Sequence, residues 1–380
     1  MKKSTTSRAL RRTCAAAAAA LLCVSGWSVS PMSTASADPG AAAPHYLMVS
    51  GVASGNLGVF RVGADGSLAK VPGSPFSIGV GVLSVIVAPD GRTVFVTSTL
   101  GTVTGYRVGD DGVPVPIPGA RTALDEPGIT AGVTPDGSRL FVAIGGAPAH
   151  ISSFAIAPSG ALSASGEPDV TIPGLSGLPS LVIDPDGRFL RINSYADGNM
   201  PSFAIGPNGH LTPIGTVATG MMPVNPAYSP DGHFIYISHE GSTELRGYAI
   251  GADGALTPTP GSPYPAGLMS HGAKITADNR YLYVPEAVSG DVRGYRIGAD
   301  GALTPLPGSP YTLPLGTMGG SVMISPDQHH LYESDVLSTN VTSMIRTFDI
   351  QSDGRLTTSS LPDVDSGTVF SDGPVLQMTH

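Results

Sequence analysis

The sequence predicts an all-β fold, a seven-bladed β-propeller with four-stranded antiparallel blades, and three observations support this prediction. A similar segment recurs at steps of 45 to 53 residues along the chain. Each copy contains short β-rich runs joined by tight turns, without the periodicity of an amphipathic helix. The two ends of the repeat region, residues 45–50 and 373–380, match two neighbouring strands of one blade.

The repeat is clearest in a phrase that opens with an aromatic residue. Residues 247–264 and 294–311 are two copies of this phrase and differ at only two positions. Self-similarity at this period is typical of propellers and solenoids. We expect the aromatic side chain to pack in the core of each blade. It recurs at Phe60, Tyr106, Phe154, Phe203, Tyr248, Tyr295 and Phe348.

Turn chemistry favours a propeller over a solenoid. Most repeats contain Pro-Asp-Gly, in which proline presets φ and glycine accepts a positive φ, and an Asp-Gly pair marks the next hairpin. Four short strands joined in this way make a propeller blade. Blades 2 to 7 are expected to begin near residues 83, 130, 180, 225, 272 and 321. Blade 1 is expected to join residues 374–379 to residues 45–72, which closes the ring and leaves no open sheet edge.

The chain is predicted to have a signal peptide at residues 1–37, a short linker at 38–44 and one propeller domain at 45–380. A basic stretch precedes an apolar run at residues 14–24, and Ala35-Ser36-Ala37 offers a cleavage site. The apolar run is too short for a stable membrane anchor. We therefore expect a secreted, extracellular protein of bacterial type. A lipoprotein attached at Cys23 and twin-arginine export are the alternatives.

Composition narrows the possible partners of the mature chain. Both cysteines, Cys14 and Cys23, lie in the predicted signal peptide, so no disulfide or thiolate site is expected. Five of the 20 Lys and Arg residues also lie there, whereas all 29 acidic residues follow it, which gives the mature chain a formal charge of −14. Such a surface repels nucleic acid and anionic lipid. We expect a monomer without a membrane span that binds a small-molecule or carbohydrate-type ligand.

Polar residues of blades 5 to 7 suggest a site at one mouth of the propeller. In each blade the first strand begins and the second strand ends at the same mouth, so residues beside these points are expected to meet. The corresponding positions of the earlier blades carry Leu83, Ile129, Pro179, Ser98 and Ile144. In blades 5 to 7 they carry His239, Glu240, His271, Glu286 and Asp335, with Lys274 on the inner strand just below His271.

Three interpretations of this mouth stay open at the level of sequence. It is a solvated rim, an acid–base or ligand-binding site, or a metal site. Crowded carboxylates tend toward a raised pKa, which suits acid–base chemistry. Carboxylate oxygens suit Ca²⁺, and added histidines suit a transition metal. No HExxH or EF-hand motif supports a metal, so no cofactor is expected except a divalent cation such as calcium.

The repeat phrase, the seven-fold count and the Pro-Asp-Gly-x-x-Leu-Tyr-Val signature resemble the bacterial β-propeller lactonase family, which includes 6-phosphogluconolactonase-type enzymes. The resemblance covers essentially the whole mature chain and implies a lactonase site. The family's Asn-Glu pair falls on His239 and Glu240, so the resemblance implies a base at Glu240. The family's Gly-Pro-Arg-His stretch falls on residues 222–225, and its Asn-Arg pair falls on Glu286 and Ala287.

The family's arginines are therefore replaced by Val224 and Ala287, and its first histidine by Pro179. Arginine is the natural partner of a substrate carboxylate or phosphate. We thus expect a lactonase-like propeller whose classical site is eroded and which binds a small polar or carbohydrate-type ligand. The alternative is an exported lactone hydrolase, and the sequence leaves enzymatic activity uncertain. The predicted catalytic residues are Glu240, His239 and His271, and the predicted ligand-binding residues are Glu286, Asp335, Lys274 and Asn225.

Arg246, Arg293 and Arg346 occupy one position of the repeat, two residues before the aromatic of the third strand. Cross-strand pairing with acidic residues is the expected role for this position, in preference to substrate binding.

Overall fold

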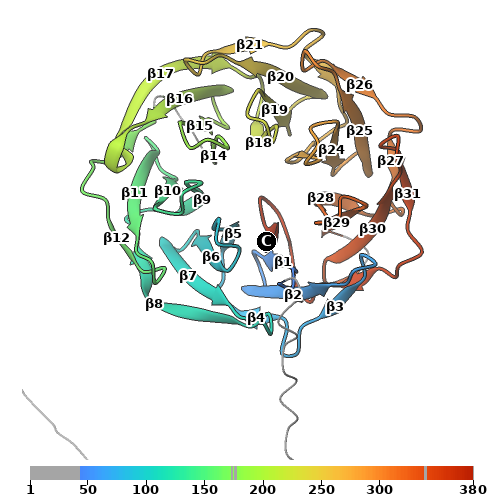
Figure 1. The fold of residues 1–380 in the computed structure, drawn as a ribbon, viewed down its shortest axis with the longest axis horizontal. Helices are drawn as coiled ribbons and strands as arrows, with labels where there is room; N and C mark the ends of the chain where they lie inside the picture. The colour runs from blue at the N-terminus through green and yellow to red at the C-terminus, as the bar shows by residue number, and fades with distance from the viewer. Residues whose placement is uncertain (1–42, 173, 175–177, 338–339, 380) are drawn as a thin grey trace, which may run out of the picture. The chain divides into compact units, whose positions relative to one another are not determined.

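Seven antiparallel sheets surround a central channel in the computed structural model (Figure 1). The structure describes residues 43–379 apart from 173, 175–177 and 338–339. Residues 43–380 form one compact unit. The seven-bladed propeller predicted from the repeats is thus confirmed, whereas the predicted signal peptide and most of the linker lie outside the described residues.

Each blade has four strands, numbered here from the channel outward. The innermost strands of blades 1 to 7 are β33 (Leu376–Met378), β5 (Val82–Val87), β9 (Gly128–Val133), β14 (Ser180–Ile183), β18 (Pro223–Tyr228), β23 (Lys274–Ile275) and β28 (Met318–Ile324). The second strands are β1 (Tyr46–Gly51), β6 (Thr93–Ser98), β10 (Arg139–Ile144), β15 (Phe189–Asn193), β19 (Phe234–His239), β24 (Tyr281–Glu286) and β29 (His330–Leu337).

The third and fourth strands form the outer part of each blade. The third strands are β2 (Asn56–Val62), β7 (Thr102–Val108), β11 (His150–Ile156), β16 (Asn199–Ile205), β20 (Glu244–Ile250), β25 (Asp291–Ile297) and β30 (Met344–Ile350). The fourth are β3 (Leu68–Lys70), β8 (Pro114–Ala123), β12 (Leu162–Ala164), β17 (Leu211–Ala218), β21 (Leu256–Pro258), β26 (Leu303–Pro305) and β31 (Leu356–Thr358). In five blades a further short strand pairs with the third: β4 (Phe76–Ser77), β13 (Val170–Thr171), β22 (Tyr264–Pro265), β27 (Tyr311–Thr312) and β32 (Val364–Asp365). The described residues also contain one 3-10 helix, η1 (Pro207–Gly209).

The two ends of the domain close the ring as predicted. Strand β33 pairs antiparallel with β1, with Leu47 opposite Met378 and Val49 opposite Leu376. The amide of Tyr46 donates to the hydroxyl of Thr379 at 2.7 Å. The closure therefore makes one continuous sheet from residues more than 300 positions apart in sequence.

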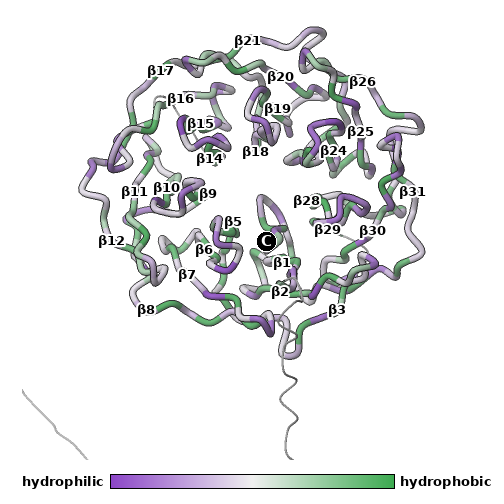
Figure 2. Tube along the Cα trace, viewed as in Figure 1, coloured by the Kyte–Doolittle hydropathy of each residue, from purple (hydrophilic) through white to green (hydrophobic). Residues whose placement is uncertain are grey.

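Hydrophobic residues recur along the strands of every blade, whereas polar residues gather at the turns (Figure 2). The repeated aromatic side chains are all buried in the cores of the blades, as predicted. At the Pro-Asp-Gly turns the glycines adopt positive φ, for example 66° at Gly91 and 72° at Gly232. Among the described residues no helix is long and apolar enough to cross a bilayer.

Candidate functional site

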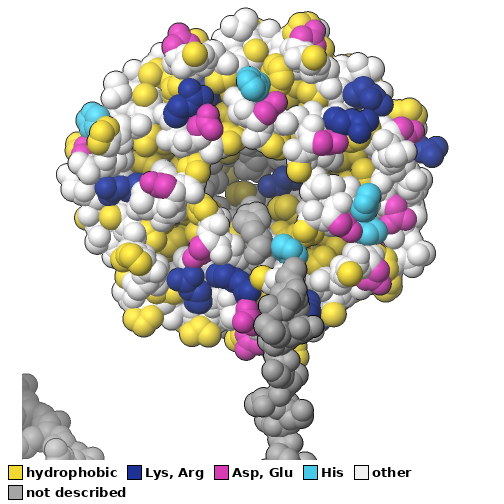
Figure 3. All heavy atoms as spheres, in the orientation of Figure 1, with side chains coloured by type: hydrophobic (Ala, Val, Ile, Leu, Met, Phe, Trp, Pro, Cys, Tyr) yellow, Lys and Arg dark blue, Asp and Glu magenta, His cyan; other side chains and the backbone are white. Residues whose placement is uncertain are grey.

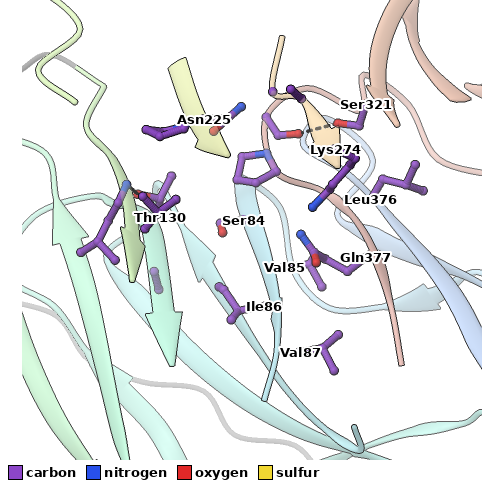
Figure 4. A pocket seen from close by; sticks show the side chains of 18 of the residues that line it. Ser84, Val85, Ile86, Val87, Thr130, Asn225, Lys274, Ser321, Leu376 and Gln377 are labelled. Atoms are coloured by element: carbon purple, nitrogen blue, oxygen red, sulfur yellow. Dashed lines mark hydrogen bonds between the residues drawn. The ribbon is translucent and has the colours of Figure 1, made fainter. Parts of the chain in front are cut away.

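Two adjoining cavities lie at one mouth of the propeller and in the part of the central channel next to that mouth. The first, here the Glu240 cavity, has a volume of about 80 Å³. The second, here the Lys274 channel, has a volume of about 200 Å³ (Figure 4). The two share the wall residues Thr130, Asn225, Gly373 and Pro374. The Glu240 cavity is further lined by Leu83, Ile129, Leu178, Ser180, Tyr195, Val224, Glu240 and Asp372.

The Glu240 carboxylate lines the smaller cavity and has two polar neighbours, Tyr195 and His271. Glu240 directly follows β19, and its amide donates to the carbonyl of Met222 at 3.0 Å. The Tyr195 hydroxyl donates to Glu240 Oε2 at 2.8 Å, while His271 Nε2 lies 3.5 Å from Oε1. Burial, together with the Glu240 carboxylate, raises the pKa of Tyr195, so its hydroxyl remains a hydrogen-bond donor. Oε2 is therefore fixed by a hydrogen bond, and Oε1 faces the His271 ring.

His271 stands behind Glu240, in the segment that leads into β23. Its Nδ1 lies 3.0 Å from the carbonyl oxygen of Gly320. Because a carbonyl oxygen only accepts, Nδ1 must carry the proton that it donates. The other nitrogen, Nε2, then faces Glu240 Oε1 at 3.5 Å and Asp372 Oδ1 at 4.0 Å. Protonation of Nε2 would give an imidazolium between two carboxylates.

Sequence analysis missed two residues of this site, Tyr195 and Asp372. Tyr195 follows the second strand of blade 4, and Asp372 precedes the innermost strand of blade 1. Both positions obey the same rule that singled out Glu240 and His271. The sequence therefore carries the signal for both residues, in the connection after β15 and in the segment before β33.

The structure does not bring His239 to the cavity. His239 is the last residue of β19 and is fully buried. Its Nε2 lies 2.7 Å from the carbonyl of Thr219 and its Nδ1 lies 2.9 Å from the carbonyl of Glu244. Burial lowers the pKa of this imidazole. The geometry corrects the expected position of His239, because its ring ties β19 to neighbouring backbone instead of facing a ligand.

Glu286 and Asp335 also lie away from both cavities. Each is fully buried and forms an ion pair with an arginine. Arg293 Nε donates to Glu286 Oε2 at 2.8 Å. Arg346 donates to Asp335 Oδ2 at 3.1 Å and to Glu333 Oε2 at 3.0 Å. The acids thus meet the repeated arginines, and this pairing corrects their predicted place at the mouth.

Asn225 and Lys274 do line the cavities. Asn225 has a φ of +35°, a backbone conformation uncommon outside glycine, and the register of β18 shifts between Val224 and Ala227. The absence of a side chain at Gly272 makes room for it, since a Cβ there would lie 2.6 Å from the Cβ of Asn225. The resulting position places the Asn225 amide on the wall shared by the two cavities. Lys274 projects into the larger cavity (Figure 4).

Within the described residues, no group of three or more His, Cys, Asp or Glu side chains is arranged to hold a metal ion. The calcium hypothesis stays a prediction, although Glu286 and Asp335 have arginine partners instead of a common centre with Glu240.

Comparison with solved structures gives the same architecture. The periplasmic gluconolactonase PpgL of Pseudomonas aeruginosa is 20% identical, with a TM-score of 0.71 over 89% of this chain and 99% of that one. A proposed 6-phosphogluconolactonase of Bacteroides fragilis is 19% identical, with a TM-score of 0.71 over 89% and 98%. A protein of Lactobacillus plantarum is 13% identical, with a TM-score of 0.71 over 89% and 100%.

These structures define the class of protein, a seven-bladed propeller with the fold of lactonase-like proteins. At 19% and 20% sequence identity, the chain has diverged far from these two proteins in sequence while sharing their fold. No family model matches the chain, and no curated protein matches it in sequence.

Proposed function

We propose that this protein binds a small hydroxyl-bearing ligand of the carbohydrate type in the Glu240 cavity. The observation that carries the proposal is the Glu240 carboxylate, which accepts a hydrogen bond from Tyr195 and lies beside His271 in a cavity that Asp372 also lines. Carboxylates accept strong, charge-assisted hydrogen bonds from hydroxyl groups. Two of them in one small cavity favour a ligand with several hydroxyls.

The remaining walls suit the same class of ligand. Leu83, Ile129 and Val224 present apolar surface, against which the C–H groups of a sugar ring or lactone can pack. Thr130 is less available for direct recognition, because its hydroxyl already donates to the carbonyl of Pro179. A few polar groups among apolar walls are the usual composition of a small-molecule site.

Hydrolysis of a lactone is the second candidate, and the short distance between His271 and Glu240 favours it. In this scheme Glu240 accepts a proton from a water molecule, whose oxygen attacks the lactone carbonyl. The ring C–O bond then breaks, and the departing oxygen receives the proton back from Glu240. His271 would position Glu240, and the Asn225 amide is the group on the shared wall that could donate to the developing oxyanion.

Isothermal titration with D-gluconolactone tests the binding proposal, and proton release in a pH-stat tests hydrolysis. Glu240→Gln keeps the size of the side chain and removes its charge. Losing a hydrogen bond to a charged group should weaken binding roughly tenfold or more. Asp372→Asn should weaken it as well. If hydrolysis occurs, Glu240→Gln should abolish it.

Glu244→Gln is the matched control, since Glu244 lies four residues away and pairs with Arg246 outside the cavity. It should bind like the wild type. Wild-type affinity in the Glu240→Gln variant would refute the proposed site, and binding with no proton release would leave a binding protein without hydrolase activity.

We also propose that the chain is exported through its N-terminal segment, on the strength of the basic, apolar and cleavage-site pattern in residues 1–37. Mass spectrometry of the protein from culture medium should find an N-terminus at Asp38. Retention of the uncleaved chain inside the cell would contradict export.

A further inference from the structure

The Lys274 channel contains one charged group without a counter-charge. Lys274 is half-buried on β23, the innermost strand of blade 6. Among the described residues that line this cavity it alone carries a charge, and none of them forms a hydrogen bond or ion pair with its amine. Burial lowers the pKa of this amine from its ordinary 10.5. An ammonium group in such a place favours an anion as partner.

Three neutral donors line the same space. The amides of Asn225 and Gln377 and the hydroxyl of Ser84 make no hydrogen bonds to other described side chains or backbone groups. Figure 4 shows that Lys274 and Gln377 extend into the cavity from one side and that Asn225 and Ser84 lie across from them. These groups come from four different blades, since Ser84 belongs to blade 2, Asn225 to blade 5, Lys274 to blade 6 and Gln377 to blade 1.

We infer that the Lys274 channel is a binding subsite for a small carboxylate. One ammonium group matches the single negative charge of a carboxylate, and the amide and hydroxyl donors can satisfy its remaining lone pairs. A phosphate dianion would leave one charge uncompensated, because no arginine and no second lysine line the cavity among the described residues. The volume of about 200 Å³ admits a small organic anion.

This subsite identifies a chemical class for the ligand of the whole site. The Lys274 channel and the Glu240 cavity share Thr130, Asn225, Gly373 and Pro374, so one ligand can extend through both. Its carboxylate would bind Lys274, and its hydroxyls would bind Glu240 and Asp372. The ligand would then be a polyhydroxy acid, which is also the product of opening a sugar lactone. This extension rests on the proposed function of the Glu240 cavity, whereas the carboxylate subsite does not.

Calorimetric titration at constant ionic strength tests the carboxylate subsite separately from the ligand that extends through both cavities. Sodium acetate carries only the carboxylate and tests the subsite alone, whereas sodium gluconate tests both cavities. Lys274→Met removes the charge and keeps much of the side-chain length, and Lys274→Arg keeps the charge. Lys70→Met is the matched control, because Lys70 is exposed on the outer strand β3. Thermal denaturation of each variant confirms that it is folded.

We expect wild type and Lys70→Met to bind acetate, Lys274→Met to lose at least roughly tenfold in affinity, and Lys274→Arg to retain binding. Inorganic phosphate should bind more weakly than acetate. Equal acetate affinity in folded Lys274→Met, or no acetate binding by the wild type, would overturn the subsite. Gluconate binding that depends on Lys274 and not on Glu240 would support the subsite and contradict the proposed function of the Glu240 cavity.

Discussion

At the scale of residues, Glu286 is a fully buried acid that pairs with the half-buried Arg293 and lies away from the cavity. Successive side chains of a strand point to opposite faces. Glu286 therefore shares a face with Leu282 and Val284, which are also fully buried. Burial and the neighbouring Asp291 carboxyl raise the pKa of Glu286 to about 8, even though Arg293 Nε lies 2.8 Å away. The pair thus makes stability depend on pH.

We expect the contribution of Glu286 to stability to fall as pH rises. Between pH 4.5 and about 8 the folded protein holds a proton on Glu286 that the unfolded chain has released. The folded state therefore binds more protons in this window, and stability decreases with increasing pH. Glu286→Gln cannot ionise, so its melting temperature should decline less over this range in calorimetry. The control Glu126→Gln changes an exposed side chain and should keep the wild-type slope. Identical slopes in all three proteins would contradict this assignment.

The same alternation sets the limit of what the sequence could predict about the site. Glu240 and His271 could be placed at the mouth because the repeat register marks where strands begin and end. His239 shares its strand face with Ile235 and Ile237, but Tyr236 and Ser238 on the opposite face are also fully buried, so alternation in the sequence could not place the His239 ring. The distance from Asp372 to His271 could not be predicted, because it depends on the path of the irregular segment before β33.

At the scale of elements, strand β33 both closes the ring and builds the site. Val375 and Leu376 are buried against blade 1 and its neighbours, and Gln377 lines the Lys274 channel. The preceding residues reach across the mouth, where Ser321 donates to the carbonyl of Gly373 at 2.9 Å. The turn motifs and the matching chain ends predicted this element from sequence. The same strand rule marks Asp372, in the segment before β33, as a residue of the mouth, and the structure shows that it lines the Glu240 cavity.

Deletion of residues 374–380 should therefore destabilise the fold and remove the site together. It exposes the edge of β1, which invites aggregation, and it removes Gln377 and the wall at Pro374. Leu376→Ala is a milder version that should cost about 2–5 kcal/mol of unfolding free energy. Chemical denaturation measures the loss of stability in both variants. A truncated protein that unfolds at the wild-type denaturant concentration would show that β33 does not close the ring.

At the scale of the whole molecule, charge limits the substrates that the mouth accepts. Charged side chains of both signs are scattered over the face of the ring that Figure 3 shows. The Glu240 cavity carries two carboxylates and no arginine in its described lining. The lactonase-like fold is therefore combined here with a site whose charge differs from that expected for a phosphorylated sugar.

We accordingly expect no measurable turnover of 6-phosphogluconolactone in a pH-stat assay. The positions where the resemblance places arginines are Val224 and Ala287, both buried. Losing one such electrostatic partner commonly costs on the order of 10²–10³ in rate. Val224→Arg restores a cation to the wall and is the informative gain-of-function variant. Robust turnover by the wild type would show that another group, with Lys274 the first candidate, serves the phosphate.

A crystal structure of the protein soaked with sodium gluconate would show whether one ligand occupies both cavities. We expect ligand density that extends from the Lys274 channel into the Glu240 cavity. The carboxylate should lie within hydrogen-bond distance of Lys274 Nζ, and at least one hydroxyl should lie within that distance of Glu240 or Asp372. Density at another face of the propeller, with both cavities free of gluconate at saturating concentration, would contradict the proposed binding site.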